Sequence, residues 1–85
     1  MYAVEVKTSA QRDLRSLSPG VFSRIDPVIH SLAENPRPRG VIKLQGFPLY
    51  RVRVGDYRML YFIDDKSRQV IILRVTHRRE VYRDD

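Results

Sequence analysis

The sequence has 85 residues, of which 42% are hydrophobic and 31% are charged, and its sixteen lysine and arginine residues against ten acidic ones give a net charge of +6. This composition describes one small soluble domain, residues 1–85, and excludes an intrinsically disordered chain. The sequence holds no cysteine, no apolar run of membrane-spanning length and no secretory signal, so we exclude disulfide chemistry and a membrane partner and expect a cytoplasmic protein.

The N-terminal segment is expected to form a strand followed by a short helix. Apolar and polar residues alternate from Tyr2 to Lys7, which indicates a half-buried strand. Thr8 and Gln11 have the spacing of a capping box. These features predict a first helix at about Ser9–Leu17.

A second helix is expected directly after the first. Ser18 can cap it, and Pro19 is typical of a first helical position. Apolar residues then recur at helical spacing from Val21 to Leu32, which gives the helix one apolar face. Pro27 lies inside this pattern, and we expect a kink there because proline removes one backbone hydrogen bond.

The segment 34–40, ENPRPRG, is expected to be a loop. Its two prolines disfavour a regular helix, and its final glycine favours a turn. Arg37 and Arg39 add charge to this loop, and we expect both side chains to be solvated. No functional role is predicted for them.

Three further strands complete the predicted fold, joined by the turn sequences GD and DDKS. Their expected positions are about Leu49–Val54, Tyr57–Asp64 and Gln69–Thr76. The order β-α-α-β-β-β predicts an α+β fold. We expect a helical hairpin packed on one face of a mainly antiparallel four-stranded sheet, with the last three strands as a meander. The pattern does not identify the partner of the first strand.

Strand alternation predicts which side chains of the meander face the helices. The expected set is Val52, Val54, Met59, Tyr61, Ile63, Ile71, Leu73 and Val75. The opposite face should mix arginines with apolar side chains, a combination that is typical of an interaction surface. The apolar residues expected there are Leu49, Leu60, Phe62 and Ile72.

Three arginines surround the predicted turn at Gly55–Asp56. A two-residue turn places Arg53 directly opposite Arg58, with Arg51 one step behind on the same face. A three-residue second loop would place Arg74 opposite Arg58 as well. Opposed like charges destabilise a sheet, and such penalties are typical of functional sites. We therefore expect a polyanionic partner, either nucleic acid or an acidic protein.

The sequence offers little for metal or cofactor chemistry. His30 and His77 are far apart and have no ligand spacing. The glycines are isolated, so no phosphate-binding glycine loop is indicated. We expect no bound metal and no small-molecule cofactor.

The C-terminal sequence HRREVY is expected to bring further functional groups to the hairpin. It places His77, Arg78, Arg79 and Tyr82 just beyond the last strand. Such a set suits metal-free cleavage of RNA, in which the 2′-hydroxyl is the nucleophile. Arginines would stabilise the charge that develops on phosphorus, and histidine or tyrosine would transfer protons. A non-catalytic RNA-binding module fits these residues equally well.

The sequence resembles the RelE/ParE superfamily of toxins from bacterial and archaeal toxin–antitoxin modules. The resemblance covers nearly the whole chain and is most specific in KLQG (43–46), YRVRVGDYRMLY (50–61) and HRREVY (77–82). RelE-like members are endoribonucleases that cut mRNA in the ribosomal A site. ParE-like members share the fold but poison DNA gyrase.

The resemblance implies roles for individual residues. The basic and aromatic positions of the RelE-like catalytic set are matched by Arg51, Arg53, Arg58, Arg78 and Tyr82. Arginine is a poor general base, so His77 and Tyr82 are the candidates for proton transfer. Further substrate contacts are expected from Lys43, Arg74 and Arg79.

The resulting prediction is a RelE-like toxin that acts as a metal-free, ribosome-dependent mRNA endonuclease. Its expected partners are mRNA in the ribosomal A site and an acidic, partly helical antitoxin that neutralises it. The alternative is a ParE-like gyrase inhibitor without hydrolytic activity.

Overall fold

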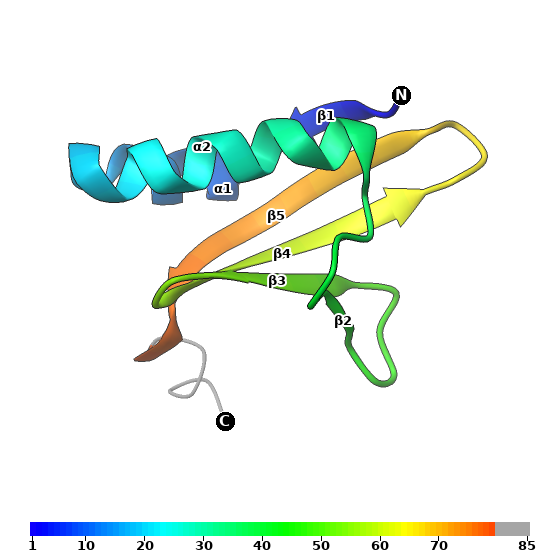
Figure 1. The fold of residues 1–85 in the computed structure, drawn as a ribbon. Coiled ribbons are helices and arrows are strands. Elements are labelled where there is room, and N and C mark those ends of the chain that lie inside the picture. The colour runs from blue at the N-terminus through cyan, green and yellow to red at the C-terminus, as the bar shows by residue number, and fades with distance from the viewer. Residues whose placement is uncertain (80–85) are drawn as a thin grey trace.

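The computed structural model describes residues 1–79, in which two helices cover one face of a five-stranded sheet (Figure 1). In chain order the elements are β1 (Ala3–Val6), α1 (Thr8–Arg15), α2 (Pro19–Glu34), β2 (Ile42–Lys43), β3 (Tyr50–Val54), β4 (Tyr57–Asp64) and β5 (Gln69–His77). The predicted α+β class and the predicted order of the longer elements are therefore confirmed. Within these residues, neither helix is long and apolar enough to cross a bilayer.

The sheet has the order β1-β5-β4-β3-β2 and differs from the prediction in two respects. It has a fifth strand, β2, whose two residues are too few to produce a recognisable alternation. It is also mixed, because β1 pairs with β5 in parallel while the other neighbours are antiparallel. A parallel neighbour needs a long crossover connection, and here α1, α2 and the meander supply it.

The two helices begin in different ways. The predicted capping box is wrong, because Thr8 already lies within α1 and Lys7 at the cap position makes no side-chain hydrogen bond. Gln11 Nε2 instead donates to the carbonyl of Val6 at 2.9 Å. The cap of α2 is confirmed, since Ser18 Oγ accepts from the backbone N–H of the third helical residue at 3.3 Å.

A β-bulge changes the expected faces of β5. Tyr61 of β4 pairs with Ile72 of β5, whereas the residue before it, Leu60, pairs with Arg74. Leu73 is therefore an extra residue that reverses the alternation. As a result Ile72 is buried against the helices, and the predictions that Ile71 and Leu73 face the helices are wrong.

One apolar cluster joins the helices to the sheet. Its buried members are Ala10, Ile25, Ile29, Leu32, Val52, Met59, Tyr61, Ile63, Val70, Ile72 and Val75. Tyr61 is the largest fully buried side chain, and its hydroxyl donates to the carbonyl of Pro36 at 2.8 Å. Burial raises the pKa of Tyr61 to about 12. This hydrogen bond ties the loop after α2 to the centre of the sheet.

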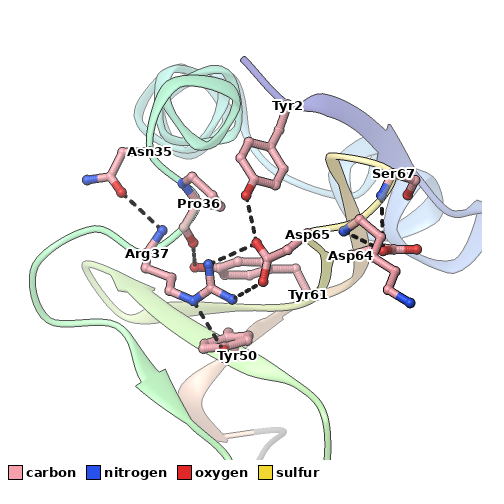
Figure 2. A network of polar contacts seen from close by, with 10 residues as sticks. Tyr2, Asn35, Pro36, Arg37, Tyr50, Tyr61, Asp64, Asp65 and Ser67 are labelled. Carbon is pink, nitrogen blue, oxygen red and sulfur yellow. Dashed lines mark hydrogen bonds and ion pairs between the residues drawn. The ribbon is translucent and has the colours of Figure 1, made fainter.

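A polar cluster, here called the clasp, closes the end of the sheet near the β4–β5 turn (Figure 2). Arg37 donates from both terminal nitrogens to Asp65, at 3.2 and 2.9 Å, and from Nε to the Tyr50 hydroxyl at 3.3 Å. The Tyr2 hydroxyl donates to the same carboxylate at 2.6 Å. These hydrogen bonds from Arg37 and Tyr2 lower the pKa of Asp65. The expectation that Arg37 is only solvated is therefore wrong.

Candidate nucleic-acid interface

The β3–β4 hairpin presents arginines at the opposite end of the sheet from the clasp. Gly55 has a φ of 60° and is the first central residue of the turn, which matches a type II′ turn. The predicted register is confirmed, because Val54 pairs with Tyr57 and Arg53 pairs directly with Arg58. Two guanidinium-bearing residues thus lie opposite one another on the face that the helices leave open.

Arg58 is held deep within this face. Only 3% of its surface is exposed, although it carries a charge. Its neighbours in the ladder are Arg53 on β3 and Thr76 on β5. Charged side chains are seldom buried this completely in proteins. The position of the guanidinium is therefore fixed by the sheet before any ligand arrives.

The start of the C-terminal tail is fastened to the hairpin turn. The backbone N–H of Arg78 donates to the carbonyl of Asp56 at 2.8 Å, and Arg78 Nε lies 3.9 Å from the Asp56 carboxylate. Arg78 thereby joins Arg53 and Arg58 around a pocket of about 160 Å³, which Gly55 and Asp56 complete. Three arginines from β3, β4 and the tail line this hairpin pocket.

A second basic pocket adjoins the first on the outer side of β3. It measures about 380 Å³ and is lined by Arg39, Gly40, Ile42, Arg51, Val52 and Arg53. Because Arg53 lines both pockets, the two are neighbours along one face. Arg39 belongs to the loop 34–40, for which no functional role was predicted.

His77 is not brought into the hairpin pocket. It pairs with Tyr57, whose side chain packs on the helix side, and the two rings meet edge to face with centroids 5.2 Å apart. Its Nδ1 accepts a hydrogen bond from the backbone N–H of Arg79 at 3.2 Å. The imidazole therefore lies on the face opposite Arg58 and holds the first turn of the tail.

Two of the expected substrate contacts, Lys43 and Arg79, are not among the residues that line the two pockets. Lys43 pairs with Tyr50 and so extends to the other face from Arg51. Arg79 is exposed just beyond β5. Tyr82, a predicted catalytic residue, lies outside the described residues.

Arg74 is hydrogen-bonded to helix α1. It pairs with Leu60 rather than with Arg58, because the four-residue turn 65–68 and the β-bulge each shift the register of β5 by one position. Its guanidinium forms two hydrogen bonds to Asp13 of α1, at 2.8 and 3.2 Å. The same carboxylate accepts from the backbone N–H of Val75 at 2.8 Å. The expectation that Arg74 opposes Arg58 is therefore wrong, and Arg74 fastens α1 to β5.

Comparison with known proteins identifies the family. The model of the ParE toxin of the type II toxin–antitoxin system parDE matches residues 4–82. The chain belongs to this toxin family. Membership in the RelE/ParE superfamily, which the sequence motifs predict, is thereby confirmed.

Named relatives and solved structures agree with this family. The toxin is 36% identical to Toxin RelG of Mycobacterium tuberculosis over 96% of this chain and 97% of RelG. Its fold is similar to the RelE–RelB complex of Pyrococcus horikoshii, with a TM-score of 0.81 and 34% identity over 91% of this chain and 94% of that one. The isolated E. coli RelE toxin matches with a TM-score of 0.80 and 26% identity, over 99% and 94% of the two chains.

The toxin's pockets contain two residues that sequence reasoning missed, Asp56 and Arg39. Asp56 was predicted as a turn residue and as a possible ion-pair partner of the hairpin arginines, but not as part of the site, and it fastens Arg78 to the hairpin. Arg39 is distant in sequence from the hairpin and reaches it because β2 pairs with β3. The short sequence VIK (41–43), which overlaps the KLQG segment at Lys43, is the one sequence feature that could have indicated this edge strand.

Proposed function

We propose that this toxin is an endoribonuclease that cuts mRNA in the ribosomal A site. The observation that carries the proposal is the hairpin pocket, which Arg53, Arg58 and Arg78 line together. Guanidinium groups bind phosphate oxygens through paired hydrogen bonds and keep their charge at neutral pH. A small pocket lined by three of them suits a phosphodiester group.

The proposed reaction uses the RNA as its own nucleophile. The 2′-hydroxyl oxygen attacks the adjacent phosphorus and loses its proton, and the bond from phosphorus to the 5′-oxygen breaks as that oxygen gains a proton. The products are a 2′,3′-cyclic phosphate and a 5′-hydroxyl. Negative charge grows on the non-bridging oxygens, where prearranged donors stabilise the transition state more than the substrate.

The roles divide between charge stabilisation and proton transfer. Arg53, Arg58 and Arg78 are proposed to stabilise the phosphorane, and Arg51 to position the strand. Arginine does not release its proton in proteins, so none of these is a general base. Because His77 lies on the other face, Tyr82 is the proposed tail residue at the cleavage site.

The proposed protein partner is an acidic antitoxin. Solved structures that match this chain include toxin–antitoxin complexes, such as RelE–RelB of Pyrococcus horikoshii. On this toxin the open face combines arginines with the half-buried apolar residues Leu60, Phe62 and Ile71. An amphipathic acidic segment complements such a face through charge and apolar contact. Cover of this kind would block the hairpin pocket and so neutralise the toxin.

Primer extension on cellular mRNA tests the proposed activity. Induced expression should stop translation and leave discrete cuts in mRNA. In a purified system with programmed ribosomes, a single 2′-deoxynucleotide at the cleavage site should abolish cutting, because it removes the nucleophile. Cleavage that persists on the deoxy substrate would refute the proposed reaction.

A second candidate function is inhibition of DNA gyrase. It is favoured by the description of the matching family model, which names the ParE toxin. In that case induction should leave mRNA intact and produce double-strand DNA breaks. Measuring both products in one induced culture separates the two functions.

A further inference from the structure

The second basic pocket is built from parts of the chain that the hairpin alone does not supply. Its lining joins Arg51 and Arg53 of β3 to Arg39 of the loop before β2. Ile42 lies on the same face, since it pairs with Arg51, and 48% of its surface is exposed. The pocket therefore combines three guanidinium groups with one accessible apolar side chain.

The loop that carries Arg39 is held in place at both ends. On one side, Arg37 is bound to Asp65 in the clasp. On the other side, the backbone N–H of Val41 donates to the carbonyl of Pro38 at 3.1 Å, and Gly40 has a φ of 86°, which glycine adopts readily. These constraints hold the loop beside β3. They reduce the conformational entropy that the loop and Arg39 would lose on binding a ligand.

The charges of this pocket favour a phosphate ligand. Among residues 1–79, no carboxylate lies within ion-pair distance of Arg39, Arg51 or Arg53. Arg53 lines this pocket and the hairpin pocket alike. A single strand with one phosphate in the hairpin pocket therefore continues past a second, adjacent cluster of arginines.

We propose that the Arg39 pocket is a subsite for the phosphate adjacent to the scissile one, and that Ile42 packs against the sugar or base of that nucleotide. Arg39 is then a substrate-binding residue of the toxin. This subsite rests on the proposed function, because it extends the path of the same single strand. It predicts that Arg39 contributes to binding of nucleic acid and not to the chemical step.

The salt dependence of binding tests the subsite without requiring cleavage. The probe is a fluorescent single-stranded 2′-deoxy octanucleotide, which cannot be cut by the proposed reaction, titrated with the purified toxin at several salt concentrations. Loss of one phosphate contact lowers the slope of log K against log salt by about 0.7, which corresponds to about fivefold weaker binding at 0.1 M salt. We expect this loss for Arg39→Gln.

The matched control is Lys66→Gln, which removes the same charge from an exposed position in the β4–β5 turn at the clasp end. It should leave the slope unchanged. Thermal melts should show equal folding of both variants, because both side chains are exposed. An unchanged slope for Arg39→Gln, or an equal loss in Lys66→Gln, would overturn the subsite. The subsite would also be overturned if Arg39→Gln weakened the binding of an acidic peptide but not the binding of the octanucleotide.

Cleavage on programmed ribosomes separates the subsite from the proposed function. Arg39→Gln should raise KM and leave kcat unchanged. Replacing one linkage next to the scissile phosphate with an uncharged methylphosphonate should raise KM for the wild type, and should have little further effect on Arg39→Gln. If the wild type binds the octanucleotide through Arg39 but cuts no mRNA, Arg39 remains a contact for a nucleic-acid phosphate, whereas the nuclease proposal fails and with it the position next to a scissile phosphate.

Discussion

The two ends of the sheet use arginine in opposite ways. At the clasp end, Arg37 donates two hydrogen bonds to the carboxylate of Asp65 and a third to Tyr50. At the hairpin end, Arg53 faces another arginine, Arg58, across the ladder. At the clasp end one arginine is paired with one carboxylate, whereas at the hairpin end three arginines line a pocket that includes one carboxylate, Asp56.

This difference separates the arginine that fastens the fold from the arginines that are proposed to bind substrate. The clasp joins the N-terminal strand, the loop after α2 and the β4–β5 turn, so its arginine contributes to holding the fold together. The hairpin arginines repel one another, and the sheet tolerates that cost. An arriving phosphate would convert the repulsion into favourable hydrogen bonds. We therefore expect substitutions at the hairpin end to lower activity and substitutions at the clasp end to lower stability.

The largest effect is expected for Arg58→Gln. It removes a buried cation from the hairpin pocket, where negative charge is proposed to develop during cleavage. Loss of one such donor typically lowers kcat by about 10²–10³-fold. Single-turnover cleavage of mRNA on programmed ribosomes measures this effect.

The control for that variant is Arg37→Gln at the clasp. It should lower the melting temperature, because Asp65 loses two hydrogen bonds and Tyr50 loses one, and it should leave the single-turnover rate of the folded toxin near the wild-type value. Arg58→Lys keeps the charge without the planar fork and should fall between Arg58→Gln and the wild type. A similar loss of kcat in Arg37→Gln would erase the distinction between the two ends.

A smaller effect, on stability alone, is expected for Tyr61→Phe. The Tyr61 hydroxyl is the buried donor to the carbonyl of Pro36, and phenylalanine leaves that carbonyl without this partner. An unsatisfied buried group of this kind costs about 1–3 kcal/mol. Urea unfolding of the wild type and the variant measures the difference. A loss near zero would show that the hydrogen bond does not stabilise the loop.

The pH dependence of the same pair gives an independent check. The folded-state pKa of Tyr61 is raised to about 12 from its ordinary value of 10. A raised pKa means that the folded state retains its proton more strongly, so this contribution is complete below pH 10 and disappears as pH rises toward 12. Between those values the wild type should lose stability more steeply than Tyr61→Phe. Parallel curves would contradict the raised pKa.

Local patterns predicted the long elements of this fold well. The hairpin register follows from a two-residue turn, and the structure has Val54 opposite Tyr57 as expected. The β-bulge at Leu73 could not be predicted, because alternation within β5 does not reveal an extra residue that only its partner strand defines. The two-residue strand β2 was missed for a related reason, since its pairing is long-range and its own pattern is too short.

The candidate site was predictable where its residues belong to the hairpin and tail motifs, and Arg78 of the tail does line the hairpin pocket. Arg51, Arg53 and Arg58 share one hairpin, and the structure places them along one face. The role of Asp13 as the partner of Arg74 depends on a contact across 61 positions, which no local pattern contains. The partners of the arginines therefore required the structure, and so did the place of Arg39 beside β3.

A still smaller change is expected for the stability of Arg53→Gln. The substitution removes one of two opposed charges, and cross-strand pairs of this kind contribute about 0.2–1 kcal/mol. The variant should therefore be slightly more stable than the wild type while it binds single-stranded nucleic acid more weakly. Urea unfolding and octanucleotide titration of the same preparation measure both properties. A less stable variant would show that Arg53 supports the fold as Arg37 does.

The smallest effect is expected for His77→Gln. This substitution tests whether the location of His77 on the helix side of the sheet keeps it out of proton transfer, although histidine is chemically suited to that role. Histidine is the side chain best matched to proton transfer at neutral pH, and loss of a general base typically costs about 10²–10⁴-fold in rate. In this toxin, however, the His77 ring packs edge to face on Tyr57 on the helix side, and its Nδ1 accepts from the backbone of Arg79. Glutamine can replace that acceptor, so the rate of mRNA cleavage and its pH profile should both stay near those of the wild type. A lost pH-dependent limb in the variant would instead place His77 at the reacting phosphate.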